Sequence, residues 1–578
     1  MEALAHFIDW ANDLLSPVLV IGLLGAGVFL TLRLGFIQVR RLAHGFAVTS
    51  GKYDDPNEPG DVSHFQALTT ALSATVGIGN IAGVALAIHW GGPGALFWMW
   101  MTALLGMATK YSEVTLAQYY RVNIEGGKAW EGSVAGGPMY YIEKGMKEVY
   151  GWNWKPVAVF FAFMLMLTSF MTGNAIQANT IATEVASNFG VATWITGLVT
   201  ATLVGIVIIG GIKRIGAVTG ILAPVMAGLY VVSALFILIL NAGAVPAALG
   251  RIIVEAFTPT AGVAGTGIGL FLVTMRYGVQ RGLFSNEAGQ GSAPIAHSAA
   301  KTDEPVSEGV VALLEPFIDT IVICTTTGLV IVATGVFDAK VPTTIPLNDN
   351  NISYLEIDPT GNYDSIRAPE RLEVREGIPV VEGDEDARFA YFDVPVDTLY
   401  LDEDHTTVFS GVIFPSEGVA RDASGQEYDA LYGNAVKNSA PLTSLGFQRG
   451  LEPVGLAPLG RWVVLICVFL FAISTAISWS YYGDRCANYL FGKRAILPYK
   501  MVFLIMHFLG AVVAVTTIWD IGDVALSLVT LPNVITLVLL SGLLSRITKS
   551  YFERKPWLEN AQVRARLRAE KKAKNEAR

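Results

Sequence analysis

The sequence predicts an all-α polytopic membrane protein with about 11 transmembrane helices and one small β-rich insert. Of its 578 residues, 52% are hydrophobic and only 15% are charged, whereas a soluble protein carries roughly 25% charged residues. The uncharged apolar runs reach the length of about 20 residues that a helix needs to cross a bilayer. One long stretch, between the eighth and ninth apolar runs, is instead acidic and strand-like.

Eleven spans of roughly 20 residues account for the apolar runs. The first run follows acidic and polar residues, so we expect a retained helix and no cleaved signal peptide. The chain then divides into a first membrane part (1–337), an insert (338–457), a second membrane part (458–545) and a tail (546–578). The predicted spans are about 14–34, 65–89, 93–120, 156–185, 194–209, 218–240, 267–283, 308–336, 461–482, 497–518 and 524–544.

Basic residues predict the orientation. They cluster after odd-numbered spans, as Arg40, Arg41, Lys213 and Arg214 illustrate. The positive-inside rule places such loops in the cytoplasm. We therefore expect a multi-pass protein of the cell (inner) membrane with its N-terminus outside and its C-terminus in the cytoplasm. The basic tail lies beside a membrane, so we interpret it as a solvated helix or an anionic-lipid contact, and expect no nucleic-acid partner.

The insert holds the excess negative charge. From Asp338 to Glu452 we count 22 Asp and Glu against 8 Lys and Arg, so the formal net charge of −9 arises there and not in the membrane body. Short β-like runs separated by Gly, Pro and Asp predict a small strand-rich domain. It follows an even-numbered span and is therefore expected outside the cytoplasm. The sequence specifies no partner for it; our hypothesis is a lid or docking surface over the external mouth.

The second span is interrupted by Gly77, Gly79, Asn80 and Gly83. Glycine destabilises a helix by about 1 kcal/mol relative to alanine. Lipid offers no hydrogen bonds to unwound backbone, so a break at this depth must be buried in protein or line a polar cavity. Broken helices of secondary transporters bind substrate and ions in this way. The alternative is that these glycines are only close-packing points between helices.

The seventh span is also rich in glycine, with glycines at the entry, midpoint and exit of the stretch 265–292. Arg276 and Arg281 lie inside or near the bilayer region of this stretch. Paired breaks five spans apart predict a 5+5 inverted repeat, with spans two to six related to spans seven to eleven.

Four stretches carry a resemblance to a known family. They are Thr75–Gly83 (TVGIGNIAG), Gly91–Trp98 (GGPGALFW), Gly136–Tyr141 (GGPMYY) and Gly278–Gly289 (GVQRGLFSNEAG). These motifs resemble the alanine/glycine:cation symporter family over nearly all of the membrane body. The resemblance implies a leucine-transporter-type (LeuT-like) core that imports small neutral amino acids with Na⁺ by alternating access, and no enzymatic activity or cofactor. The insert departs from the usual pattern of the family.

An amino acid presents a carboxylate and an ammonium group. Around the first break, the residues expected at the substrate are Thr75, Gly77, Gly79 and Asn80, because freed amides at a helix N-terminus suit a carboxylate. Asn80 can equally cap the following half-helix.

Further substrate contacts are predicted on other spans. Gln177 offers an amide oxygen to the ammonium, or else an interhelical hydrogen bond; the family pattern favours the site. Phe271, Thr274 and Met275 flank the expected second break and can shape a small pocket, with core packing as the alternative. Trp479 can close the pocket against larger side chains, or anchor its helix at the interface.

For the cation, we predict an uncharged cage of oxygen atoms. It combines carbonyl groups near Ala74 and Gly77 with the hydroxyl groups of Ser474, Thr475 and Ser478, although helical Ser and Thr often bond to their own helix. Neither glycine-broken span holds a carboxylate before Glu287, which favours Na⁺ over a proton as coupling ion. The carboxylates that can overturn this choice are those of Glu113, Glu315 and Asp319.

Other classes of function fit less well. The sequence has no Walker A loop, HExxH motif or serine-hydrolase elbow, which argues against an enzyme. A proton-coupled symporter of the same fold and a channel built from the same helices remain as alternatives. A sensor would need a sizeable cytoplasmic output domain, and the sequence predicts none.

Overall fold

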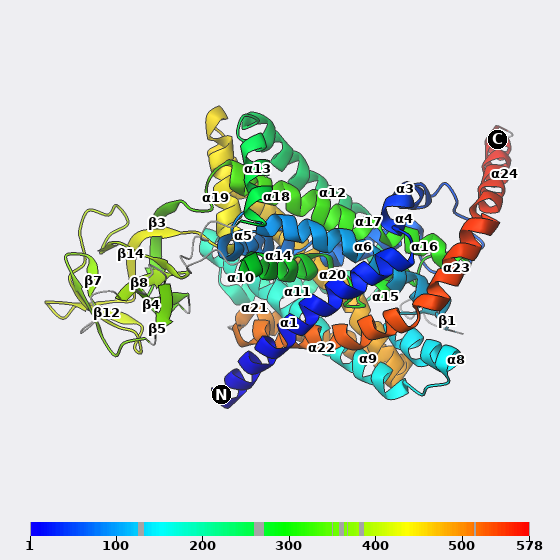
Figure 1. Cartoon of the computed structure of the whole chain (residues 1–578), viewed down its shortest axis with the longest axis horizontal. Coiled ribbons are helices and arrows are strands. Elements are labelled where there is room, and N and C mark those ends of the chain that lie inside the picture. Colours follow the sequence, from blue (N-terminus) through cyan, green and yellow to red (C-terminus); the bar gives the residue numbers. More distant parts are fainter. Residues whose placement is uncertain are drawn as a thin grey trace.

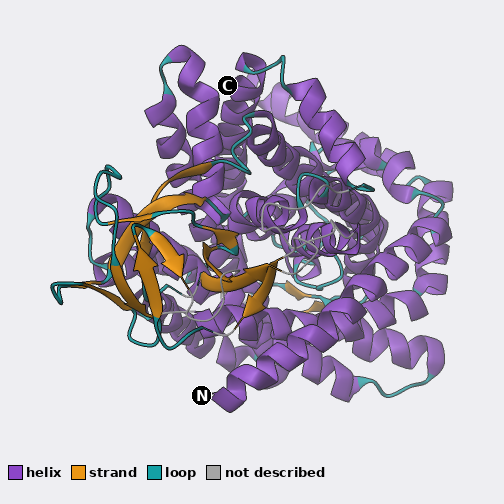
Figure 2. Ribbon diagram, turned by 60° about the vertical axis from the view of Figure 1, so that its left-hand side comes forward, coloured by secondary structure: helices purple, strands orange, loops and turns teal. Residues whose placement is uncertain are grey.

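The computed structural model describes residues 2–124, 132–258, 271–349, 351–357, 363–366, 368–380, 387–513 and 516–576. The chain forms a helical body with a strand-rich insert at one end, while the C-terminal helix extends from the opposite end (Figure 1). The insert lies to one side of the helices in a second view as well (Figure 2).

The helices before the insert follow one another with few long loops. They are α1 (Glu2–Arg33), α2 (Ile37–Arg40), α3 (Leu42–Thr49), α4 (His64–Thr75), η1 (Gly79–Gly83), α5 (Val84–Gly91), α6 (Ala95–Tyr119), α7 (Pro138–Tyr140), η2 (Tyr141–Gly145), α8 (Met146–Tyr150), α9 (Lys155–Phe170), η3 (Met171–Ala175), α10 (Ile176–Phe189), α11 (Thr193–Ile208), α12 (Gly211–Leu240), α13 (Val245–Glu255), α14 (Phe271–Asn286), α15 (Ala293–His297), α16 (Pro305–Ala312), α17 (Leu314–Pro316), η4 (Phe317–Cys324) and α18 (Thr325–Ala333).

After the strands of the insert, the chain returns to the helical body. These helices are α19 (Ser439–Leu451), η5 (Glu452–Val454), α20 (Ala457–Phe491), η6 (Lys493–Ala495), α21 (Ile496–Val512), α22 (Thr516–Leu539), α23 (Ser541–Arg554) and α24 (Trp557–Glu576).

The predicted break in the second span is confirmed. Ser63 begins α4 with a capping box, its side chain accepting from the backbone N–H of Gln66. The helix ends at Thr75, and Val76 has a non-helical backbone (ψ 86°). Helical winding resumes at η1, and the two halves are bent by 54° relative to one another. The glycine-rich stretch therefore divides this span into two half-helices.

The second break lies later in the chain than predicted. The α14 helix runs unbroken through Gly278 and Gly282 to Asn286, so the expected break at the middle of this span is wrong. The chain unwinds only from Glu287 to Ser292, where Glu287 and Gly289 have φ values of 53° and 89°. Residues 259–270, which include the entry glycines, lie outside the described part of the chain.

The glycines in the middle of α14 are packing points instead. A Cβ atom on Gly278 would lie 2.3 Å from the carbonyl oxygen of Ala95, and one on Gly282 would lie 3.2 Å from the Cα atom of Met99. Both neighbours belong to α6. Small residues let two helix backbones approach closely within a membrane, so these glycines mark the α14–α6 contact.

One side chain connects the two breaks. The Oδ1 atom of Asn80 accepts a hydrogen bond from the backbone N–H of Gly77 at 2.9 Å. Its amide nitrogen donates to Ser285 Oγ at 3.1 Å and to Asp319 Oδ1 at 2.6 Å. Gly77 lies in the first unwound segment, and Ser285 lies in the last turn of α14 before the second. Asn80 is fully buried, so these bonds are shielded from water.

Apolar length supports several of the predicted spans. Among the described residues, five helices are long and apolar enough to cross a bilayer: 155–186, 211–240, 305–333, 457–491 and 493–512. Two bent pairs, 64–91 and 524–554, raise the number to seven when each pair is taken as one span. These segments correspond to the predicted spans four, six, eight, nine and ten, and to spans two and eleven.

The predicted insert (338–457) contains short strands up to Val436, as predicted, and ends in the helical segments α19 and η5. Within the described residues the sheet orders are β10-β14-β3, β13-β12-β11-β6-β7 and β5-β4-β8-β9, and a separate β1-β2 hairpin lies outside the insert. The strands are β1 (Val122–Asn123), β2 (Val134–Ala135), β3 (Lys340–Pro346), β4 (Ile352–Ile357), β5 (Tyr363–Ile366), β6 (Leu372–Arg375), β7 (Ile378–Val380), β8 (Ala387–Tyr391), β9 (Val394–Pro395), β10 (Leu399–Tyr400), β11 (Gly411–Phe414), β12 (Val419–Asp422), β13 (Glu427–Tyr428) and β14 (Ala430–Val436).

The insert contacts the helical body at two places. Antiparallel β3 and β14 form its stem, in the register Val341↔Ala435. The stem leads into α19, which packs on α20 and donates a hydrogen bond from Thr443 Oγ1 to the carbonyl oxygen of Ile81 at 2.8 Å. At the second place, the His89 ring contacts the carbonyl oxygen of Phe392 at 3.1 Å. The insert therefore contacts the half-helix that follows the first break.

We predict that Asn80→Ala destabilises the protein by about 1–3 kcal/mol for each buried polar group that it leaves unpaired. These groups are the Gly77 N–H and one oxygen of Asp319. Denaturant unfolding of the purified protein in detergent measures the loss. Asn241→Ala is the matched control, because the half-buried Asn241 side chain also donates two hydrogen bonds, one to the Ile237 carbonyl of α12 and one to the Gly450 carbonyl of α19. Equal stability of the two variants would contradict the connecting role of Asn80.

Candidate functional site

A small cavity lies where the two unwound segments meet. Its walls come from the first break, the η3–α10 region, the second break, α20 and α22. The volume is about 20 Å³, enough for about one water molecule. The lining residues are Ala74, Thr75, Gly77, Ile78, Gly79, Thr172, Gln177, Phe284, Glu287, Gln290, Thr475, Trp479 and Leu526. We call this space the central cavity.

The structure brings many of the predicted site residues together there. Thr75, Gly77 and Gly79 line the central cavity from the first break, and Gln177 and Trp479 line it from α10 and α20. The predicted cation ligands Ala74 and Thr475 also lie in its wall. Segments separated by about 400 positions in the sequence therefore meet at one small space.

Three predicted residues lie elsewhere. Phe271, Thr274 and Met275 do not line the central cavity. Thr274 Oγ1 donates to the carbonyl oxygen of Gly91 at 2.7 Å, and the Phe271 ring lies 5.5 Å from that of Trp98. The three residues were placed by a break at the middle of the span. Since the chain unwinds only after Asn286, they lie several helical turns before the unwound segment.

Asn80 does not line the central cavity either. Its hydrogen bonds to Gly77, Ser285 and Asp319 use both ends of the amide, so its observed role is to join the two breaks. This role differs from both predicted alternatives, because Asn80 accepts from the residue three positions earlier and not from the start of the next half-helix.

The cavity offers acceptors to a positively charged group. Gln177 donates its amide N–H to the carbonyl oxygen of Thr172 at 3.1 Å, while its Oε1 atom is buried without a hydrogen-bond partner among the described residues. The carboxylate of Glu287 accepts from Ser292 Oγ and, at 3.3 Å, from the indole N–H of Trp479. An ammonium group in the cavity would meet both the Gln177 amide oxygen and the Glu287 carboxylate.

The residues that sequence reasoning missed come mainly from the second break. Phe284, Glu287 and Gln290 line the central cavity, as do Thr172 and Leu526. The available signal was the Ser285–Gly289 segment, where the carboxylate of Glu287 follows directly after the predicted seventh span and lies two residues before a glycine. Intramembrane carboxylates are generally functional or paired, and this rule predicts that Glu287 lies at the site.

An oxygen-rich spot lies beside the first break. Thr475 Oγ1 donates to the carbonyl oxygens of Ser73 and Ala74 at 3.2 and 3.3 Å. Ser474 Oγ also reaches Ser73 O at 3.2 Å but bonds to its own helix at Phe471 as well. The buried Ser478 Oγ has no hydrogen-bond partner among the described residues. Such uncharged oxygen atoms, in unwound carbonyl groups and hydroxyl groups, are ligands that suit Na⁺.

A second polar cluster surrounds Asp319 in the η4 segment. Its carboxylate accepts hydrogen bonds from Asn80, Ser285 Oγ at 2.7 Å and Thr320 Oγ1 at 2.8 Å. The cluster lies behind the first break and does not line the central cavity. The three donors satisfy this buried carboxylate, and carboxylates within membrane spans often mark functional sites.

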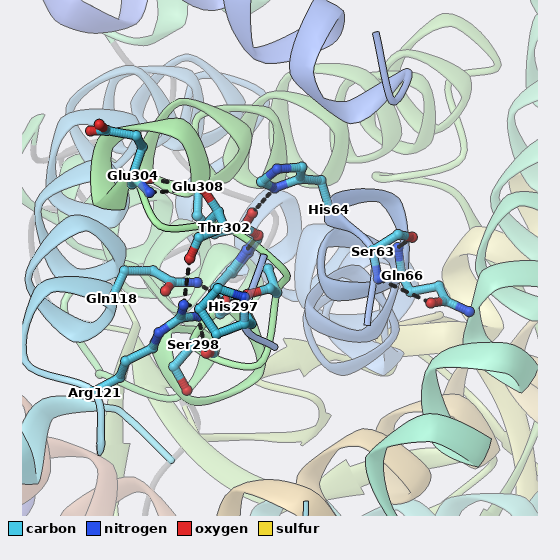
Figure 3. A network of polar contacts seen from close by, with 12 residues as sticks. Ser63, His64, Gln66, Gln118, Arg121, His297, Ser298, Thr302, Glu304 and Glu308 are labelled. Atoms are coloured by element: carbon cyan, nitrogen blue, oxygen red, sulfur yellow. Dashed lines mark hydrogen bonds and ion pairs between the residues drawn. The ribbon is translucent and has the colours of Figure 1, made fainter. Parts of the chain in front are cut away.

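A buried ionic network ties together the ends of several helices. Glu308 of α16 contacts His64 of α4 and, at 2.5 Å, His297 of α15, and Gln118 donates to the His297 carbonyl oxygen at 2.6 Å (Figure 3). Arg121 donates to the carbonyl oxygen of Ala300 at 2.8 Å. This network fixes the half-helix that precedes the first break against α6, α15 and α16.

Known proteins match this chain over most of its helical body. A profile of the Sodium:alanine symporter family matches residues 1–355 and 430–565, so the stretch left unmatched falls within the strands of the insert. The sodium/alanine symporter AgcS of Methanococcus maripaludis is 38% identical over 547 residues, which cover 94% of this chain and 97% of the relative. The amino-acid carrier protein AlsT of Bacillus subtilis is 41% identical over 324 residues, or 56% of this chain and 66% of the relative.

A solved structure of MhsT in complex with L-phenylalanine matches 84% of this chain and 90% of its own, with a TM-score of 0.47 and 13% sequence identity. This chain belongs to the sodium:alanine symporter family.

Proposed function

We propose that the chain imports a small neutral amino acid, alanine or glycine, together with Na⁺, by alternating access across the cell membrane. The main evidence for this proposal is the central cavity, where both unwound segments lie next to Gln177, Thr475 and Trp479. Family membership supports Na⁺-coupled amino-acid transport. The buried Trp479 ring in the cavity wall supports a small substrate, because it would oppose a long side chain.

The architecture that we propose has eleven spans, of which spans two to eleven form a 5+5 inverted repeat of the leucine-transporter type. The N-terminus lies outside, and the insert and the C-terminus lie on opposite sides of the membrane. Two breaks that face one cavity support this arrangement, because inverted repeats of transporters place their discontinuous helices at the shared substrate site.

In the proposed mechanism, the substrate carboxylate binds the backbone amides exposed around Gly77 and Gly79. The ammonium group lies against Gln177 Oε1 and the Glu287 carboxylate. Na⁺ lies beside Ala74, Gly77 and Thr475, with Ser474 and Ser478 as further hydroxyl ligands. The cavity has a volume of only about 20 Å³, so it must expand to admit an amino acid and close again around it. Sites of this kind couple substrate and ion because both bind the same unwound segment.

A proton-coupled symporter is the second candidate, because Glu287 places a carboxylate in the cavity wall. A proton on Glu287 would replace Na⁺ as the coupling charge. The two candidates differ in the gradient that drives uptake, so one experiment separates them.

We expect purified protein in liposomes to accumulate labelled alanine when an inward Na⁺ gradient is applied. A proton gradient alone should give no accumulation above background. Counterflow without any gradient tests for saturable exchange, which a carrier shows and a channel does not. Accumulation that follows the proton gradient would favour the second candidate, and absence of Na⁺-dependent uptake for every small neutral amino acid would remove the first.

We predict that Thr475→Ala raises the Na⁺ concentration needed for half-maximal uptake by about tenfold, equivalent to the loss of roughly 1.4 kcal/mol of ion binding. The substitution removes one hydroxyl ligand beside the Ala74 carbonyl. Ser480→Ala is the matched control, since Ser480 lies on the same helix and bonds to the Ile477 carbonyl at 2.6 Å. Unchanged Na⁺ dependence in Thr475→Ala would place the cation elsewhere, with the Asp319 cluster as the next position to examine.

We predict that Trp479→Leu widens the range of substrates toward larger neutral amino acids such as leucine. The Trp479 ring is 2% exposed and closes the cavity directly against Gly173, where an added Cβ atom would lie 2.3 Å from the ring. One extra methylene in an apolar pocket changes discrimination by about 1–3 kcal/mol. Competition of unlabelled amino acids with alanine uptake measures the range. Trp462→Leu, an exposed position on the same helix, should leave the range unchanged.

A further inference from the structure

A second and larger cavity adjoins the central one. It has a volume of about 260 Å³ and lies between α1, α14 and α22. Three side chains, those of Phe284, Gln290 and Leu526, line both spaces and therefore separate them. Its other lining residues are Leu19, Val20, Leu23, Gln280, Arg281, Leu283, Ser527 and Thr530. We call it the side cavity.

The volume of the side cavity suits a small molecule. Pockets for drug-sized ligands begin at roughly 300 Å³, and alanine and glycine are smaller than such ligands. The central cavity has about 20 Å³ in this conformation, so of the two neighbouring spaces only the side cavity can hold a whole amino acid without rearrangement. The difference in size suggests that the two spaces are filled in sequence.

The cationic side chain in the wall of the side cavity is that of Arg281. The Nε atom of Arg281 is buried without a hydrogen-bond partner, and no carboxylate forms an ion pair with Arg281 among the described residues. The neighbouring Gln290 side chain is 6% exposed, and its Oε1 atom also lacks a hydrogen-bond partner within the described chain. Positive charge in a membrane protein is expensive to bury unless it is paired, and it often marks a ligand route.

The chemistry of Arg281 and Gln290 determines which ligand fits the side cavity. A guanidinium group pairs with a carboxylate through two parallel hydrogen bonds. The amide oxygen of Gln290 accepts from an ammonium group. Leu19 and Leu23 of α1 and Leu283 of α14 give the wall an apolar part that accepts a short apolar side chain. A small neutral amino acid carries all three features.

Phe284 connects Arg281 to the first break. The Arg281 guanidinium carbon lies 5.9 Å from the centre of the Phe284 ring, within the range of a cation–π contact. On the other side, a Cβ atom on Gly79 would lie 3.2 Å from the same ring. A carboxylate that binds Arg281 competes with the Phe284 ring for the guanidinium group. Filling the side cavity therefore acts on the side chain that separates it from the unwound segment at Gly79.

We propose that the side cavity is a staging site, in which Arg281 holds the substrate by its carboxylate before Phe284 moves and the substrate enters the central cavity. This inference rests on the proposed function. It gives α1, the span outside the proposed repeat, a role in substrate handling as one wall of the site.

The test compares Arg281→Gln with the wild-type protein in vesicles of phosphatidylcholine. At saturating Na⁺ and labelled alanine, the wild type should bind two alanine molecules per chain and the variant one. The KM for uptake should rise about tenfold, with a much smaller change in kcat, and Arg281→Lys should recover part of the loss. Arg276→Gln is the matched control, because Arg276 is an exposed residue of the same helix.

A second variant tests the cavity without removing the charge. Leu19→Trp fills the side cavity from α1 and should also reduce binding to one alanine molecule per chain. This variant keeps the proposal testable should Arg281→Gln fail to fold, and the one alanine that remains bound shows that the central cavity is intact.

Two results would overturn the staging site. The first is wild-type KM and stoichiometry in both Arg281→Gln and Leu19→Trp. The second is a KM that responds to added phosphatidylglycerol in the wild type but not in Arg281→Gln, because Arg281 would then bind a lipid phosphate. In either case wild-type uptake driven by Na⁺ leaves the proposed function standing, whereas a wild type that takes up no amino acid with Na⁺ removes that function itself.

Discussion

Unwound backbone inside a membrane must find hydrogen-bond partners within the protein, and the rest of this structure depends on how that demand is met. Lipid supplies no partner to a free N–H or carbonyl group. The Asn80 side chain meets part of the demand at the first break, because it accepts from the Gly77 N–H, and it also donates to Ser285 in the last turn before the second break and to Asp319. The two unwound segments are therefore held next to each other by one buried amide, and the central cavity forms beside it.

The same constraint leaves useful groups unpaired. The Gln177 and Gln290 amide oxygens and the Ser478 hydroxyl are buried without hydrogen-bond partners among the described residues. An unpaired buried polar group is unfavourable by about 1–3 kcal/mol, so several within a short distance of one cavity indicate a site that awaits polar ligands. The cavity is too small for an amino acid in this conformation, and Trp479 and Phe284 are the bulky side chains in its wall that must move to enlarge it.

The glycine pattern of the sequence predicted the first break correctly but not the position of the second. Gly77 and Gly79 lie in or next to a real break, whereas Gly278 and Gly282 lie in a continuous helix and pack against α6. Both uses of glycine give the same local signal, since each relies on the missing Cβ atom. The second break instead occurs at Glu287–Ser292, and this error moved the predicted contacts to Phe271, Thr274 and Met275. Ala74 was found because its carbonyl group lies beside the first break, and Gln177, Thr475 and Trp479 because they are polar or bulky residues in apolar spans.

The sequence by itself determined the class of this protein, a helical membrane protein with a small strand-rich insert and a broken second span, because hydrophobic length, charge and helix-breaking residues act locally along the chain. Its motifs also identified the family. Only the tertiary structure decided where the second break lies, that Asn80 joins the two breaks, and that Glu287, Phe284 and Arg281 face two adjoining cavities. Those features depend on which distant helices pack together, and local propensity carries no information about that packing.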